Sequence, residues 1–494
     1  MSCIIRRASL DLNVTQKAFP YQVEAFNAVK DLPYSAIFHE QGLGKTKIAI
    51  DLCLYWLEKK DIDTVVIVTK KQLVKNWDDE FKFHTHIKPS IMSNKRSDNY
   101  LIFNGISEVI ITNFEAVMVE QERFELFLKC RHVAVILDES TKIKNPESKI
   151  SQCFFSLSDG FKFKTIMTGT PVANRPYDIW AQIYFLDKGK SLGEDFIAFK
   201  KQHDLSNKLQ SDLDLRNTFE NNVGEVFNKI SSFSVRETKK SCAIDLPQKS
   251  FHTILADFEG RQHELYQKIV KECQVEVYKD GSLILDNDEE CLKRLLRLNQ
   301  VASNPSLIDD SYNRTSGKEK ALDSLLNEII ERKEKVIIWS SYIQNIDILK
   351  DRYKCYGAVK IHGRMAIEDR NKAVDKFKKD ETCRVLFATP QAAKEGLTLT
   401  VANNAIFYDR TFNLDDYLQA QDRIHRISQK KNCFIYIIKI HNSIDDWIDA
   451  LLVAKQQAAF LAQGDISKDE YKALADYSYS QLIKNILEEA EGHE

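Results

Sequence analysis

The 494-residue sequence lacks several features that would place it in a specialised class of protein. No run approaches the roughly 20 apolar residues that a membrane-spanning helix needs, and no apolar segment near the amino terminus predicts a signal peptide. Ten cysteines are scattered without a Cys-x-x-Cys pair or a metal-ligand spacing, which favours free thiols in a reducing compartment. Low-complexity tracts and internal repeats are absent as well. We therefore expect an intracellular protein with no membrane partner.

The chain also lacks a strong net charge. Its formal charge is −2, so nucleic-acid binding would have to come from a local basic surface rather than from a global field. Hydrophobic residues make up 43% and charged residues 29%, which is typical of a soluble globular protein. A chain of this length exceeds one ordinary core, and two to four domains are expected.

The stretch His39 to Thr46, His-Glu-Gln-Gly-Leu-Gly-Lys-Thr, is the first segment with a clear chemical reading. An apolar run precedes it and an apolar-periodic segment, 48–57, follows it, which predicts strand, turn and helix. In that context glycines such as Gly42 and Gly44 let backbone N–H groups surround phosphates at a helix N-terminus. Lys45 is expected to reach the β and γ phosphates of ATP, and the Thr46 hydroxyl to bind Mg²⁺.

Asp138 and Glu139 follow a run of five apolar residues, 133–137. A buried parallel strand that ends in two carboxylates places them at the ligand edge of a sheet. We expect Asp138 to hold Mg²⁺ and Glu139 to orient or deprotonate the attacking water. An exposed acidic loop is the alternative, and the phosphate loop upstream makes it the weaker one.

Alternating strands and helices predict an α/β fold with two parallel-sheet lobes. Further strands are expected at 64–69, 109–115, 166–168, 250–255, 336–340, 359–363, 385–389, 405–409 and 434–438. The expected domains are residues 1–245 with a helical insertion at about 187–234, residues 246–442 with a helical lead-in at about 256–310, and a helical segment, 443–494.

Two arginines in the second half, Arg423 and Arg426, are three residues apart and would share one face of a helix. For an isolated helix, surface ion pairs would be the default reading. A complete phosphate site upstream instead favours arginine fingers that reach the γ phosphate from the second lobe, which can be worth about 10³ to 10⁵ in rate. Gln22, before the phosphate loop, could read an adenine edge with its amide or be a solvent-facing helix residue.

The ordered set of motifs resembles the Swi/Snf family of ATP-dependent DNA translocases, within superfamily 2 of the helicases. The matching segments cover roughly residues 15–440: Pro20-Tyr21-Gln22, Glu40 to Thr46, Asn76-Trp77, Glu80-Phe81, Thr112 to Glu115, Asp138-Glu139, Lys142-x-Lys144-Asn145, Thr168 to Pro171, Arg236 with Lys239, Leu246 to Lys249, Asn304-Pro305, His362-Gly363, Gly396 to Thr398 and Asp422 to Ile427.

Some positions depart from the family pattern. His39 stands where the family usually has aspartate, and Gln41 where it usually has methionine. Ser140-Thr141 replaces the usual Ala-His after the acidic pair, and Ser428 stands at a usual glycine. Ser140, Arg175-Pro176 and the segment 392–398 look nearest to the branch of annealing helicases. No departure removes a catalytic charge.

The resemblance implies two RecA-like lobes, ATP and Mg²⁺ as cofactors, and double-stranded DNA as the partner, with forked or single-stranded DNA as a variant. Gln22 and Gln419 would help bind the nucleotide. Contact with DNA, or its coupling to hydrolysis, would involve Lys70, Lys71, Lys142, Lys144, Thr168, Gly169, Thr170, Thr389 and Gly396. The compartment would be cytoplasmic in a bacterium or virus and nuclear in a eukaryote.

Three functions stay open at this point. The first is a translocase that hydrolyses ATP to remodel DNA or DNA–protein complexes. The second is a strand-separating or annealing helicase, or the motor subunit of a restriction or defence system, which strand displacement on forked and blunt duplexes would distinguish. The third is a catalytically silent DNA-binding scaffold, which has no reason to keep Lys45, Asp138, Glu139, Arg423 and Arg426 together.

Overall fold

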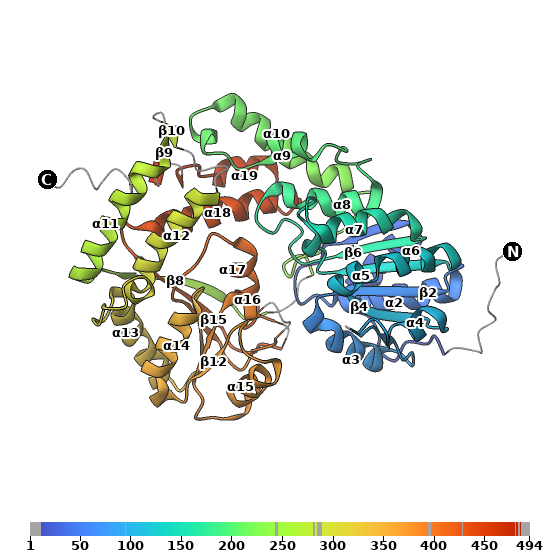
Figure 1. Cartoon of the computed structure of the whole chain (residues 1–494), viewed down its shortest axis with the longest axis horizontal. Helices are drawn as coiled ribbons and strands as arrows, with labels where there is room; N and C mark the ends of the chain where they lie inside the picture. Colours follow the sequence, from blue (N-terminus) through green and yellow to red (C-terminus); the bar gives the residue numbers. More distant parts are fainter. Residues whose placement is uncertain are drawn as a thin grey trace. The chain divides into compact units, whose positions relative to one another are not determined.

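A computed structural model of the chain describes residues 11–93, 95–242, 246–279, 282–283, 289–393, 397–426, 428–479, 481–482 and 485. The chain forms two compact units (Figure 1). Unit 1 comprises Met1–Asp204, Asn221–Ile244 and Leu461–Ile466. Unit 2 comprises Leu205–Glu220, Asp245–Phe460 and Ser467–Glu494. Both units are therefore assembled from separate stretches of sequence.

Unit 1 is built on a seven-stranded, all-parallel sheet in the order β3-β4-β2-β5-β6-β1-β7. Its strands are β1 (Tyr34–Ile37), β2 (Thr64–Thr69), β3 (Ser90–Ile91), β4 (Val109–Asn113), β5 (Val133–Asp138), β6 (Phe163–Met167) and β7 (Ser234–Val235). Its helices are α1 (Pro20–Val29), α2 (Lys45–Lys59), α3 (Val74–His84), α4 (Tyr100–Asn104), α5 (Phe114–Val119), α6 (Gln121–Cys130), α7 (Lys149–Leu157), α8 (Trp180–Asp187) and α9 (Phe196–His203).

Unit 2 is built on a six-stranded, all-parallel sheet in the order β12-β13-β11-β14-β15-β8. Its strands are β8 (Lys249–Ala256), β11 (Val336–Trp339), β12 (Val359–Ile361), β13 (Val385–Ala388), β14 (Asn404–Phe407) and β15 (Cys433–Ile440), with a separate small hairpin of β9 (Tyr278–Lys279) and β10 (Ser282–Leu283). Its helices are α11 (Gly260–Val277), α12 (Glu289–Ser303), α13 (Gly317–Glu331), α14 (Ile343–Arg352), α15 (Ile367–Lys379), α16 (Pro390–Ala393), α17 (Leu414–Gln421) and α19 (Lys468–Leu474).

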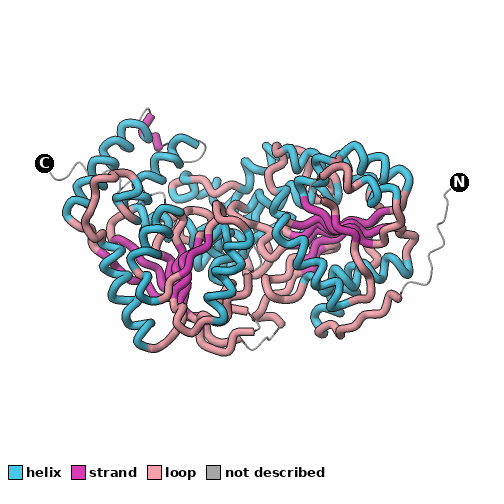
Figure 2. The backbone as a smooth tube through the Cα atoms, turned by 60° about the horizontal axis from the view of Figure 1, so that its bottom comes forward, coloured by secondary structure: helices cyan, strands magenta, loops and turns pink. Residues whose placement is uncertain are grey.

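Two long helices, α10 (Leu213–Ile230) and α18 (Ile444–Ala462), each contain one of the points at which the chain passes from one unit to the other. The seven strands of unit 1 form one sheet, and all strands of unit 2 except the β9–β10 hairpin form another, each with helices packed beside it (Figure 2). Within the described part of the chain, no helix is both long enough and apolar enough to cross a lipid bilayer.

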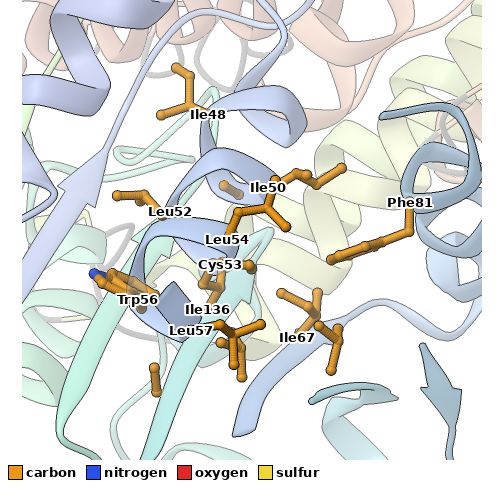
Figure 3. Close-up of a cluster of buried hydrophobic side chains, with 14 of the residues drawn as sticks. Ile48, Ile50, Leu52, Cys53, Leu54, Trp56, Leu57, Ile67, Phe81 and Ile136 are labelled. Carbon is orange, nitrogen blue, oxygen red and sulfur yellow. The ribbon is translucent and has the colours of Figure 1, made fainter. Parts of the chain in front are cut away.

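The core of unit 1 forms where α2 packs on the sheet. Leu54 and Leu57 of α2 lie beside Ile67 of β2 and Ile136 of β5 (Figure 3), and the strand residues are fully buried. Strands buried on both faces are expected to be continuous apolar runs, and β2 and β5 have that pattern. This packing fixes the N-terminus of α2, and with it the preceding loop, against the carboxyl edge of the sheet.

Two local expectations were wrong. The strand expected at 109–115 ends at Asn113, because the Asn113 side chain accepts a hydrogen bond from the Ala116 N–H and caps α5. The helix expected to carry Arg423 and Arg426 ends at Gln421. The Arg423 carbonyl then accepts a hydrogen bond from Leu399 N–H at 3.0 Å, which ties the chain to another segment of unit 2 instead of continuing the helix.

Candidate functional site

The carboxyl edge of the unit 1 sheet gathers most of the residues expected to act in unit 1. Strands β2, β5, β6, β1 and β7 are consecutive neighbours and run parallel, so the residues that follow them meet at one edge. Those residues are Lys70 after β2, Glu139 after β5, Thr168 to Thr170 after β6, His39 to Thr46 after β1, and Arg236 after β7. The strand order and the parallel direction of the strands therefore bring the loop and the acidic pair to the same edge.

The loop before α2 has the backbone that its glycines make possible. Gly42 and Gly44 have φ angles of +90° and +70°, in the left-handed region that other residues avoid. Gln22 lies against the loop: its Nε2 donates to the Leu43 carbonyl at 3.1 Å, and its Oε1 accepts from Phe19 N–H at 2.9 Å. A Cβ atom at Gly44 would lie 2.3 Å from Gln22 Nε2, so glycine is required there for two reasons.

Lys45, the first residue of α2, turns its ammonium back over the loop. Its Nζ donates to the carbonyls of His39 at 2.9 Å and Glu40 at 3.3 Å. Burial lowers the pKa of Lys45 to about 8, while the nearby Glu139 and Asp138 carboxylates oppose the shift. Burial and then the Lys45 charge lower the pKa of His39 to about 4, so this imidazole is neutral at pH 7. The cation at the loop is thus held by backbone carbonyls and by the acidic pair's field.

Asp138, the last residue of β5, is held firmly by one of its two carboxylate oxygens. Oδ2 accepts hydrogen bonds from Thr69 Oγ1 at 2.9 Å and from the Trp77 indole Nε1 at 2.8 Å. Burial, and then the neighbouring Glu139 carboxylate, raise the pKa of Asp138 to about 6, whereas these two hydrogen bonds lower it. A carboxylate fixed in this way has one defined orientation.

Glu139 has a strained backbone. Its φ angle is +56°, in the left-handed region, where residues other than glycine, asparagine and aspartate are uncommon. Its carboxylate Oε2 lies 3.4 Å from Lys70 Nζ. Such backbone conformations cost about 1–3 kcal/mol and concentrate at functional sites. The strain turns Glu139 away from the course of β5 while Asp138 stays within the strand.

The oxygen atoms at this edge fit a magnesium ion that is held mainly by phosphates and water. No described residue donates a hydrogen bond to Asp138 Oδ1, and the Thr46 hydroxyl makes no hydrogen bond with any of them. Mg²⁺ is usually bound through one or two protein oxygens plus substrate phosphates. Among the described residues, no group of three or more His, Cys, Asp or Glu side chains forms a metal cage. Thr46 and Asp138 are thus suitable ligands for a nucleotide-bound ion.

The segment after β6 packs directly on the phosphate loop. Thr168 is fully buried and its N–H donates to the Ile37 carbonyl of β1 at 3.2 Å. Thr170 N–H in turn donates to Thr168 Oγ1 at 3.2 Å. A Cβ atom added to Gly169 would lie 2.6 Å from Gln41 Cγ and 3.4 Å from Lys45 Nζ. Because the segment contacts Gln41 and Lys45 this closely, a movement of the segment would displace the loop.

The sequence did not reveal what holds several of these groups. Trp77 belonged to a motif but had no assigned role. Its hydrogen bond to Asp138 joins residues 61 positions apart, and their spacing in the sequence does not indicate that they meet. The contacts of Lys239 were likewise not predicted. Its backbone N–H donates to the Glu40 carboxylate, and its Nζ forms an ion pair with the same carboxylate at 3.2 Å. Arg236 donates to the Phe38 carbonyl at 2.6 Å and forms a two-pronged ion pair with Asp465.

Three of the four lysines expected to contact DNA are paired with acidic side chains. Lys70 pairs with Glu139 at 3.4 Å, Lys142 with Glu115 at 2.8 Å, and Lys144 with Asp178 at 3.3 Å. Lys71 is exposed in a short 3-10 turn before α3. Of the four, Lys71 is the one whose ammonium is most accessible to a phosphate backbone.

The remaining expected residues belong to unit 2. Arg423 is almost fully buried and donates to the carbonyls of Gln419 at 3.1 Å and Leu397 at 3.3 Å. Arg426 donates to the Asp422 carbonyl at 3.1 Å and to Thr398 Oγ1 at 2.9 Å, and burial lowers its pKa from the ordinary value. Both arginines are thus held by backbone and hydroxyl oxygens of unit 2.

Two further residues complete the set from unit 2. Gln419 is buried in α17 and its Nε2 donates to Asp415 Oδ1 at 2.7 Å. Thr389, at the carboxyl end of β13, is buried and its N–H donates to the Ile361 carbonyl at 3.2 Å. Gly396 lies outside the described residues.

A parallel sheet whose carboxyl edge combines a Gly-Leu-Gly-Lys-Thr loop with an Asp-Glu pair defines a P-loop nucleotide-binding protein. Unit 2 adds a second all-parallel sheet, and the two sheets form a pair of RecA-like lobes. The chain belongs to the SNF2-related family. The SNF2-related domain matches residues 33–307, more than half of the chain, and the helicase conserved C-terminal domain matches residues 317–428.

Curated relatives agree with this family. An uncharacterized ATP-dependent helicase of Mycoplasma pneumoniae is 28% identical over 426 residues, covering 85% of this chain and 39% of the relative. An ISWI chromatin-remodeling complex ATPase of Arabidopsis thaliana is 26% identical over 480 residues, covering 90% of this chain and 43% of the relative. The chain thus spans about two fifths of the length of the curated relatives it matches.

A solved structure is also similar over most of its length. The SWI2/SNF2 ATPase core of Sulfolobus solfataricus, in complex with double-stranded DNA, is 20% identical, with 95% of this chain and 99% of that chain covered and a TM-score of 0.42.

Proposed function

We propose that the chain is a DNA-dependent ATPase that translocates on double-stranded DNA. One observation carries the proposal: Lys45 lies near Asp138 and Glu139 at the carboxyl edge of the unit 1 sheet, where the Gly-Leu-Gly-Lys-Thr loop follows β1. Both carboxylates are close enough to oppose the lowering of the Lys45 pKa. Membership of the SNF2-related family supports DNA as the partner.

In this proposal the loop of unit 1 binds ATP through backbone N–H groups and Lys45. Thr46 and Asp138 would hold Mg²⁺, which when bound neutralises charge on the β and γ phosphates. Glu139 accepts the proton of the attacking water. Its backbone, at φ +56°, turns it out of the course of β5 at the edge where the loop lies. Thr69 and Trp77 act through Asp138, because their hydrogen bonds keep its carboxylate ionised and correctly turned.

Arg423 and Arg426 would complete the reaction by supplying positive charge to the γ phosphate as charge develops there. The phosphate loop belongs to unit 1 and the arginines to unit 2. A reaction that needs both is expected to be slow until DNA aligns the units, which would couple hydrolysis to movement along the duplex. The coupling residues proposed are Thr168, Gly169 and Thr170 beside the loop, together with Thr389 and Gly396 in unit 2.

DNA contact is proposed to involve the phosphate backbone, with Lys71 as the leading candidate in unit 1. Each lysine–phosphate contact lowers the slope of log K against log salt by about 0.9 on duplex DNA. Lys71→Ala should therefore weaken binding on all sequences and flatten the salt dependence by about one unit. Lys70, Lys142 and Lys144 would first have to leave Glu139, Glu115 and Asp178.

The test is steady-state ATP hydrolysis with no nucleic acid, duplex DNA, forked DNA, single-stranded DNA and RNA. Duplex DNA should stimulate the wild-type rate, Glu139→Gln should lower it at least about 100-fold, and Arg426→Ala about 10³-fold. Matched controls are Glu122→Gln, at an exposed carboxylate on α6, and Arg384→Ala, before β13 and thus at the opposite end of that strand from Thr389. Both should keep the wild-type rate.

Each outcome has a defined meaning. Preferential stimulation by forked or single-stranded DNA, with strand displacement, would replace translocation on duplex DNA by strand separation or annealing. Hydrolysis that Arg426→Ala leaves unchanged would remove the arginine from the reaction. Absence of hydrolysis with every nucleic acid would refute the proposal for this chain and favour a binding scaffold.

A further inference from the structure

Gln41, in the middle of the phosphate loop, has a buried amide oxygen to which no group in the described part of the chain donates. The residue is 8% exposed, and its Oε1 accepts no hydrogen bond from any described residue. A buried amide oxygen without a donor costs free energy, so a native protein that keeps one usually uses it. Nearby Gln22 provides the contrast, because both ends of its amide bind backbone groups.

The position of Gln41 is fixed by the segment after β6. The Cβ atom that Gly169 lacks would lie 2.6 Å from Gln41 Cγ and 3.4 Å from Lys45 Nζ. The Gln41 side chain and the Lys45 ammonium therefore flank the same point, where the loop meets Gly169. Lys45 is the residue that reaches the outer phosphates, so Gln41 lies on the side of the loop that faces the reacting phosphate.

We infer that Gln41 is a further catalytic residue, whose amide orients the water that attacks the γ phosphate of ATP. This inference rests on the proposed ATPase function. The carbonyl Oε1 accepts a hydrogen bond from the water, and Nε2 donates to a γ-phosphate oxygen. A water molecule and a phosphate together satisfy both ends of the amide, whereas an anion alone would leave the acceptor unused.

The reaction balances without a change in Gln41 itself. The water oxygen forms a bond to the γ phosphorus as the bond from that phosphorus to the β–γ bridging oxygen breaks. The bonding electron pair leaves with ADP, and the proton of the water passes to the Glu139 carboxylate. Gln41 gains and loses no proton, so its contribution is to hold the water in line with the leaving oxygen.

The experiment compares wild type with Gln41→Met, which keeps the length of the side chain and removes the amide, and with Gln41→Asn, which keeps the amide on a shorter stem. Turnover, KM for ATP, and affinities for ADP and for ADP with aluminium fluoride are measured. Gln152→Met, at an exposed glutamine on α7, is the control. Gln41→Met should lower kcat about 100-fold and weaken the aluminium fluoride complex equally. Affinity for ADP should stay unchanged, because ADP lacks the γ phosphate, and Gln41→Asn should recover part of kcat.

Several results would overturn the inference. One is a kcat for Gln41→Met equal to that of wild type. Another is an equal loss of affinity for ADP and for the aluminium fluoride complex, which would make Gln41 a structural part of the loop. If wild type binds ADP without turnover, equal aluminium fluoride affinity in the two proteins overturns the inference. Wild type that binds no nucleotide would instead refute the proposed function, and the inference with it.

Discussion

Gly169→Ala tests whether the segment after β6 controls the phosphate loop. The backbone at Gly169 has no positive φ, so alanine introduces no backbone strain and the effect is purely steric. Its Cβ would lie 2.6 Å from Gln41 Cγ and 3.1 Å from Gln41 N, and both separations are shorter than an ordinary van der Waals contact. Because the second atom belongs to the backbone, the loop itself has to shift.

Overpacking of a close-packed site costs about 1–3 kcal/mol. If the loop relieves that cost by leaving the geometry that binds phosphates, affinity for ADP should fall about 5- to 150-fold. The assay is titration calorimetry with ADP and Mg²⁺, because binding without turnover separates the loop's geometry from the chemistry. Gly260→Ala, where a Cβ meets nothing within 4 Å, is the control and should bind ADP like wild type.

A double-mutant cycle tests whether the Gln41 side chain is the group that the new methyl group contacts. Gln41→Ala removes the Cγ atom with the closest overlap, so Gly169→Ala combined with Gln41→Ala should bind ADP about threefold or more tighter than Gly169→Ala alone. Wild-type affinity in Gly169→Ala would refute the steric coupling. A double mutant weaker than Gly169→Ala would show that Gln41 supports the loop rather than blocking the new methyl group.

Two further predictions concern the groups around the phosphate loop. Trp77→Phe removes a hydrogen bond to Asp138 and should raise the Mg²⁺ concentration for half-maximal turnover about 10-fold. Trp56→Phe is the control, because the Trp56 indole donates to a backbone carbonyl, and it should leave that concentration unchanged. An equal shift in both variants would contradict the role of Trp77. Lys45→Met should stabilise the ligand-free chain at pH 7 by about 1–3 kcal/mol, since burial holds the lysine's pKa at about 8 against 10.5. The unfolded wild-type chain binds more protons between pH 8 and 10.5, so wild-type stability rises with pH there and the gain should shrink in urea unfolding at pH 9.5. A gain independent of pH would refute this, and Lys164→Met, at another lysine with a pKa of about 8, should show the same pH dependence.

The sequence was sufficient for elements that burial alone determines. The strand expected at 64–69 is β2, because an uninterrupted apolar run has a single stable place in a parallel sheet. The positions of the Gly-Leu-Gly-Lys-Thr loop and of the acidic pair could be predicted in a similar way, since each follows a largely buried strand, β1 and β5, while their roles stay predictions. The order of the strands in the sheet brings the loop and the acidic pair to the same edge, and this order cannot be read from the separation of the two motifs along the sequence.

Features that depend on contacts between distant residues were not predictable. The hydrogen bond from Trp77 to Asp138 joins residues 61 positions apart, and neither residue has a local pattern that indicates it. The two-residue strand β7 is too short for any periodicity. The helix expected to continue through Arg426 has the right local pattern, but the Leu399 N–H competes for the Arg423 carbonyl. Tertiary contacts override local helix propensity where a distant residue supplies the backbone hydrogen bond.

The ion pair between Arg236 and Asp465 has a consequence for biosynthesis. The two residues are 229 positions apart, and both belong to unit 1. At about 5–20 residues per second, a ribosome needs roughly 10 to 50 seconds to synthesise the intervening chain. During that interval the Arg236 guanidinium, which holds the carbonyl just before the phosphate loop, lacks the carboxylate that neutralises it. Unit 1 is therefore complete only after the segment Leu461–Ile466 has been synthesised, long after its sheet.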